Sequence, residues 1–152
     1  MPESQVLDAI ALLKQDHRTV EDLFAQFEKA SGDGRKQTIA EQICLELSVH
    51  AKIEEEIFYP ACEGKVEEDL LKEAYVEHDG AKLLIAQIMA GEPSDEFYDA
   101  KVTVLQEQIE HHVEEEEKRM LPGRRAVPAG SEPLEALSTP SHSGLSKHVR
   151  QL

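Results

Sequence analysis

Two stretches of this chain carry a histidine followed by a glutamate four residues later. The pairs are His50 with Glu54 and His112 with Glu116, and a proline follows each glutamate by six residues. Because four residues make about one helical turn, an imidazole and a carboxylate at this spacing project from the same face of a helix. Each pair is therefore predicted to present two metal-binding groups side by side.

A further histidine precedes each pair at nearly the same distance. His17 lies 33 residues before His50, and His78 lies 34 residues before His112. Four imidazoles and two carboxylates are more than one tetrahedral zinc ion needs, and they suit two metal ions of intermediate hardness. Carboxylates can bridge two ions through their two oxygens, while the histidines leave positions open for water or a small oxidant.

Four segments with helical periodicity can position these residues. They cover about residues 4–30, 35–59, 67–90 and 94–121. His17 lies within the apolar stripe of the first segment, and Pro60 and Pro122 are expected to end the second and the fourth. The loops place the histidines of each hairpin at similar heights, at about 1.5 Å of rise per residue. The sequence therefore predicts an all-α, up-down-up-down four-helix bundle with its site near mid-height.

The composition changes after the fourth segment. Residues 1–122 are predicted to form the bundle, and residues 123–152 an irregular tail, rich in Pro, Ser and Gly, that is partly ordered at best. His142 and His148 belong to this tail and lie outside the repeat. We expect them to be exposed to solvent rather than to bind metal.

The charge and hydropathy of the chain argue against several partners and locations. A net charge of −15 argues against nucleic acid or an anionic membrane surface as a partner. The sequence shows neither the features of a signal peptide nor an apolar run of about 18–20 residues that could span a bilayer. Cys44 and Cys62 are expected to lie too far apart for a disulfide bond. A reduced, cytoplasmic protein is the expectation.

Residues 16–18, 50–60, 77–79 and 111–117 resemble the signature of the hemerythrin-like, or HHE cation-binding, domains, and the resemblance covers about residues 8–122. It implies a non-haem di-iron centre with an oxo or hydroxo bridge, in which the two glutamates also bridge the ions. Manganese or zinc could occupy the same site. The ligands that the resemblance implies are His17, His50, Glu54, His78, His112 and Glu116.

At one position the chain departs from the oxygen-carrying hemerythrins. Those proteins place a second histidine four residues after the first on their third helix, where this chain has Lys82. One terminal ligand is therefore replaced, which leaves room for water or peroxide or requires another side chain. Tyr75, about one turn before His78, is a candidate for an extra ligand or for a hydroxyl beside the ligands; the alternative is a core aromatic residue.

The resemblance implies several functions, which include oxygen carriage, oxygen or redox sensing, iron homeostasis, nitric oxide response and peroxide breakdown. We favour a di-iron protein that binds O2 or a related small oxidant, such as peroxide or nitric oxide, in redox sensing or buffering. One alternative is an enzyme with catalase-like peroxide dismutation, which Lys82 favours over simple oxygen carriage. Another is an iron-homeostasis module that acts through a protein partner.

Overall fold

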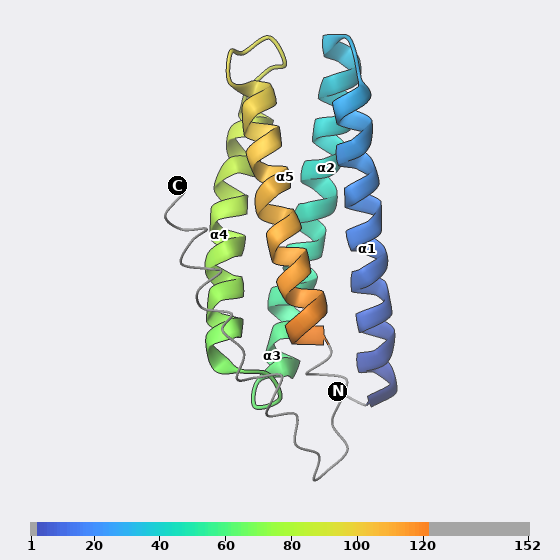
Figure 1. The fold of residues 1–152 in the computed structure, drawn as a ribbon, viewed down its shortest axis with the longest axis vertical. Coiled ribbons are helices and arrows are strands. Elements are labelled where there is room, and N and C mark those ends of the chain that lie inside the picture. Colours follow the sequence, from blue (N-terminus) through green and yellow to red (C-terminus); the bar gives the residue numbers. More distant parts are fainter. Residues whose placement is uncertain (1–2, 122–152) are drawn as a thin grey trace.

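The computed structural model describes residues 3–121, which form a bundle of helices that run alternately up and down (Figure 1). α1 packs against α2, α4 against α5, and α2 against α4. The predicted all-α four-helix bundle is thus confirmed, while the predicted tail lies outside the described residues. The long helices are α1 (Glu3–Lys29), α2 (Asp33–Ile53), α4 (Glu68–Ala90) and α5 (Tyr98–Glu115).

Two π-helical turns extend α2 and α5, and each begins at a glutamate of the repeat. η1 (Glu54–Phe58) follows α2 and continues into the short helix α3 (Tyr59–Cys62), and η2 (Glu116–Met120) follows α5. In both turns the hydrogen bonds span five residues, from the Tyr59 N–H to the Glu54 carbonyl and from the Leu121 N–H to the Glu116 carbonyl. Single π turns of this kind often occur at functional sites.

The expectation that Pro60 ends the second helix is wrong, because the helix continues to Cys62. Pro60 lies in the first turn of α3, directly after the π turn. Proline has a backbone φ that suits a helix, and its missing N–H disrupts a helix only where an α-helical hydrogen bond is required. The change of hydrogen-bond register at the π turn removes that requirement.

The fourth helix begins later than the sequence suggested, at Tyr98 rather than near Ser94 or Asp95. The Asp95 carboxylate accepts a hydrogen bond from the Glu92 N–H at 2.7 Å, which stabilises a turn over residues 93–97. Such side-chain bonds to the backbone compete with helix formation. At the start of the helix Tyr98 is buried, whereas Phe97 is 62% exposed.

Apolar side chains form two clusters, one on each side of the level that holds the repeated histidines. Burial of each large apolar side chain contributes about 1.5–3 kcal/mol, so the two clusters hold this level in place and shield it from water. The loop-end cluster lies toward the α1–α2 and α4–α5 connections and includes Val20, Phe24, Ile43, Leu47, Ala81 and Leu105. The terminal-end cluster includes Ile10, Leu13, Phe58, Tyr59, Leu70 and Leu121.

Two smaller findings complete the fold. Cys44 and Cys62 are both buried and are not joined by a disulfide bond. Within residues 3–121, none of the helices is long and apolar enough to cross a membrane.

Candidate metal centre

The structure brings the six repeated histidines and glutamates together at one level of the bundle. All six are buried, and Glu54 and Glu116 have no exposed surface. Their ligand atoms form two groups, within each of which the atoms lie within 4.8 Å of one another, and Glu54 belongs to both. The first group contains His17, His50, Glu54 and Glu116, and the second contains Glu54, His78 and His112.

Each glutamate contacts one histidine of each group through different oxygens. Glu54 places Oε2 at 2.9 Å from His50 Nε2 and Oε1 at 3.0 Å from His78 Nε2. Glu116 places Oε1 at 3.0 Å from His17 Nε2 and Oε2 at 3.2 Å from His112 Nε2. This arrangement suits two cations bridged by carboxylates, since each carboxylate directs one oxygen to each group.

Four ligand atoms of the first group are buried and lie close to one another in pairs, but these contacts lack hydrogen-bond geometry, and no other described residue offers these atoms a hydrogen bond. They are His17 Nε2, His50 Nε2, Glu54 Oε2 and Glu116 Oε1. Buried polar atoms are almost always hydrogen-bonded, so a convergent set without partners requires an explanation. A metal ion among these nitrogen and oxygen atoms would satisfy all four, and the residues present therefore fit a metal ion.

Every histidine of the site also contacts a carboxylate through its other ring nitrogen. A carboxylate accepts hydrogen bonds, so Nδ1 carries the proton and Nε2 is left to bind metal. The sequence analysis did not identify these carboxylates, although in both copies of the repeat an acid precedes the first histidine and another follows the glutamate. The pairs are His17–Glu117 at 2.6 Å, His50–Asp16 at 3.1 Å, His78–Glu55 at 2.7 Å and His112–Glu77 at 2.7 Å.

Lys82 contacts one of these outer carboxylates instead of a metal-binding atom. Its Nζ lies 2.9 Å from Glu55 Oε1, just as Arg18 contacts Glu117 at 2.8 Å in the other half of the bundle. Burial acts to raise the pKa of Glu55, but hydrogen bonds from Lys82 and His78 hold it below its usual value. Lys82 therefore keeps the acceptor of the His78 N–H ionised.

Tyr59 is a residue of this site that the sequence analysis missed. Its buried hydroxyl lies 2.7 Å from Glu116 Oε2 and 3.0 Å from Glu54 Oε1, and 3.2 Å from Nε2 of both His78 and His112. Burial and the negative charges of the two glutamates hold the pKa of Tyr59 well above its usual value. Without a metal the phenol is therefore neutral, whereas a cation beside it would favour the phenolate.

The helix geometry explains why Tyr59 was missed. In an α-helix a residue five positions after Glu54 is rotated by about 140° from it, so Tyr59 was not expected on the site face. The π turn brings it back toward that face. The repeat gave no signal either, because the residue at the equivalent position in the other copy is Leu121.

The structure places Tyr75, the tyrosine singled out from the sequence, farther from the ligand atoms. Its side chain is 37% exposed, and its ring packs edge-on against the ring of Tyr59 with centroids 5.3 Å apart. Tyr75 thus covers Tyr59 from outside, and the tyrosine hydroxyl that contacts the site glutamates belongs to Tyr59.

The charges of the site predict how the metal-free protein responds to pH. Burial acts to lower the pKa of His50, but Glu54, Glu116 and Asp16 raise it from 6.5 to about 9. The folded state therefore binds this proton more tightly than the unfolded state, which contributes about 3 kcal/mol of stability below pH 6.5. That contribution is lost as the pH rises from about 6.5 to about 9.

Urea unfolding of the metal-free protein at pH 6 and pH 9.5 measures this effect. We expect a smaller free energy of unfolding at the higher pH. The metal-loaded protein is the control, because a metal ion on Nε2 replaces the proton and removes this decline. Greater stability of the metal-free protein at pH 9.5 would contradict this view of His50.

Comparisons with known proteins identify the family to which the chain belongs. The chain is 29% identical over 118 residues to a protein named DNA nickase from Nostoc sp. strain PCC 7120, covering 78% of this chain and 34% of that protein. The chain thus spans about a third of that relative's length. It also resembles the crystal structure of a hemerythrin HHE cation binding domain-containing protein from Mycobacterium kansasii, at a TM-score of 0.67 and 22% identity.

That structural match covers 94% of this chain and 85% of the Mycobacterium kansasii chain, and at this identity it concerns the fold. The family model of the hemerythrin HHE cation binding domain matches residues 8–123, which is most of the chain and nearly the range that the sequence motifs indicated. The resemblance seen in the sequence is confirmed, and the chain belongs to the hemerythrin HHE cation binding domain family.

Proposed function

We propose that this protein holds two iron ions and binds O2 or a related small oxidant, such as peroxide or nitric oxide, in redox sensing or buffering. The observation that carries the proposal is the pair of ligand groups that share Glu54, with each glutamate contacting a histidine of both groups. Membership of the HHE family supports it. Imidazole and carboxylate ligands suit iron, and they would also hold manganese or zinc.

The six ligands have distinct roles in this proposal. His17 and His50 would hold one ion and His78 and His112 the other, and Glu54 and Glu116, which contact histidines of both groups, would hold both. When bound, the pair of irons supplies electron exchange with the oxidant. The outer carboxylates fix the imidazole rings through Nδ1, and the two apolar clusters exclude bulk water.

A catalase-like reaction with peroxide is the second candidate. It is favoured by Lys82, which replaces a ligand of the oxygen carriers and contacts Glu55 rather than a ligand atom of the site. The Nostoc relative, a longer protein, is named DNA nickase, and this chain is poorly suited to the DNA binding that the name indicates. The net charge of −15 would repel the phosphates of DNA.

Anaerobic reduction of the iron-loaded protein, followed by exposure to O2, tests the first candidate. We expect the optical spectrum of the iron centre to change when O2 is added and to return to the starting spectrum on reduction. A spectrum that does not change with O2, peroxide or nitric oxide would contradict the proposal. Hydrogen peroxide tests the second candidate in the same preparation. Sustained evolution of O2 would identify a catalase-like enzyme, whereas its absence would leave a binding protein.

A further inference from the structure

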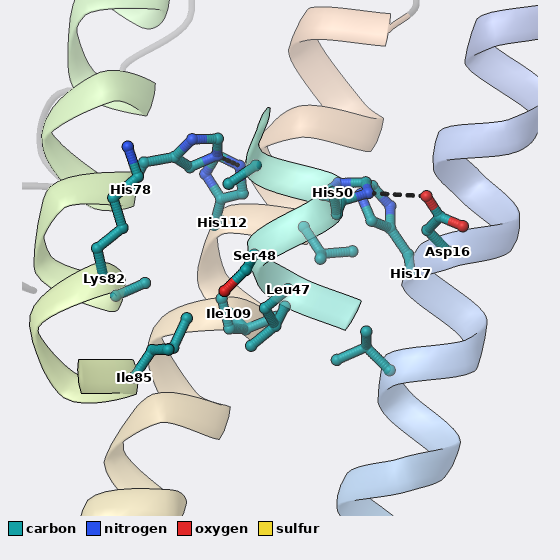
Figure 2. A pocket seen from close by; sticks show the side chains of 14 residues that line it. Asp16, His17, Leu47, Ser48, His50, His78, Lys82, Ile85, Ile109 and His112 are labelled. Atoms are coloured by element: carbon teal, nitrogen blue, oxygen red, sulfur yellow. Dashed lines mark hydrogen bonds and ion pairs between the residues drawn. The ribbon is translucent and has the colours of Figure 1, made fainter. Parts of the chain in front are cut away.

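A cavity of about 220 Å³ lies beside the four site histidines (Figure 2). The histidines form one wall, and apolar side chains from all four long helices form the others. The cavity is on the side of the loop-end cluster, whereas Tyr59 belongs to the terminal-end cluster. The apolar lining residues include Val20, Leu47, Ala81, Ile85, Ile109 and Val113.

Three polar side chains also line the cavity, and each comes from a different helix (Figure 2). Of its lining residues, Ser48 and Lys82 are exposed and Asp16 is half-buried. Lys82 is held by its ion pair with Glu55 at 2.9 Å, so its charge is directed to a carboxylate. The exposed side chains of Ser48 and Lys82 connect the cavity to the surface, and a ligand that enters past them meets apolar walls up to the histidine rings.

The cavity is much larger than the proposed oxidants need. A cavity of about 150 Å³ with apolar walls binds benzene and stays free of water, and one water molecule occupies only about 30 Å³ in the liquid. O2, peroxide and nitric oxide each have two heavy atoms, so any of them would leave most of the space unfilled. Apolar walls also offer ordered water few hydrogen-bond partners.

We propose that this cavity binds a small, uncharged and mainly apolar organic molecule, of the size of benzene or somewhat larger, with one edge against the histidine rings. This inference rests on the proposed function, because the occupant would stand beside the oxidant-binding centre and limit the space left for the oxidant. The fit follows from the volume of the cavity and from its apolar walls.

Toluene is a suitable probe, and isothermal titration calorimetry of the metal-loaded protein measures its binding. We expect saturable binding of one toluene per chain with a Kd of about 0.1–1 mM, as befits seven heavy atoms without hydrogen bonds. Ala81→Leu places three more carbons in the cavity and should weaken binding at least tenfold. Ala86→Leu, on the exposed side of the same helix, is the matched control and should leave the Kd unchanged.

Val20→Leu reduces the cavity volume from the α1 side and is the second test variant if Ala81→Leu fails to fold. It should also weaken toluene binding. Absence of saturable toluene binding, or equal affinity in the filled variants and the wild type, would overturn the inference. Metal content measured on the same samples separates this result from the proposed function. Protein that binds toluene but holds no iron would support the cavity site and contradict the di-iron proposal. Protein that holds two irons but binds no toluene would support the di-iron proposal and contradict the cavity site.

Discussion

Replacement of Glu54 by glutamine is expected to lower the iron content from about two per chain to fewer than one. Glu54 belongs to both ligand groups and contacts His50 at 2.9 Å and His78 at 3.0 Å through different oxygens. A neutral amide keeps the shape of the side chain but removes the anionic oxygen from both ions. His50→Ala affects one group only, and about one iron per chain should remain.

Glu56→Gln is the matched control, because Glu56 lies on the same π turn with its side chain 62% exposed. Its iron content should equal that of the wild type. Iron content measured by mass spectrometry, with helix content by circular dichroism, separates loss of metal from loss of fold. Full iron content in folded Glu54→Gln protein would show that Glu54 does not bridge the two ions.

Replacement of Tyr59 by phenylalanine is expected to change the second ligand group and leave the first intact. The Tyr59 hydroxyl lies within 3.2 Å of His78, His112 and the two glutamates, so it is placed to bind an ion held by these residues. We propose that the Tyr59 oxygen binds this ion as a phenolate. It would take the role of the second histidine that the oxygen-carrying hemerythrins have at the position of Lys82. Ferric phenolates absorb visible light by charge transfer from the ligand, and Tyr59→Phe should abolish this band.

Tyr75→Phe is the matched control for this experiment. Tyr75 packs against the Tyr59 ring and is partly exposed, so the loss of its hydroxyl should leave the visible band in place. The opened position in Tyr59→Phe should also speed the reaction with peroxide by about tenfold or more, because water and peroxide gain access to the ion. A band that survives in Tyr59→Phe and disappears in Tyr75→Phe would assign the ligand to Tyr75 instead.

Helix periodicity and loop positions were sufficient to predict that six residues meet at one level. His17 lies within an apolar stripe, and a histidine and a glutamate four residues apart share a face, so both placements follow from α-helical geometry alone. The second copy of the repeat predicts the same placement for His78, His112 and Glu116. These predictions hold because nothing interrupts the α-helical register before Glu54 and Glu116.

The sequence failed where the backbone departs from that register. The π turn after Glu54 lets the helix continue beyond Pro60 and rotates Tyr59 toward the site. No residue pattern that we recognise in the sequence predicts this π turn. The later start of α5 at Tyr98 follows turns that are closed by hydrogen bonds among Glu92, Asp95 and Tyr98, which helix propensity does not reveal. The outer carboxylates could have been predicted from the sequence, because both copies of the repeat carry them.

The two sides of the site differ in a way that the repeat conceals. On the terminal-end side Tyr59 closes the second ligand group, and its counterpart in the repeat is Leu121. On the loop-end side the histidines adjoin the 220 Å³ cavity (Figure 2). We therefore expect oxidants to approach from the cavity, while Tyr59 limits the chemistry on the opposite side.

Anomalous diffraction at the iron absorption edge, from crystals of aerobically purified protein, would show whether the protein holds two iron ions at this level of the bundle. We expect two iron peaks per chain, one among the ligand atoms of His17, His50, Glu54 and Glu116 and the other beside His78 and His112. A single peak, a signal at the zinc edge alone or no peak at this level of the bundle would contradict the di-iron centre.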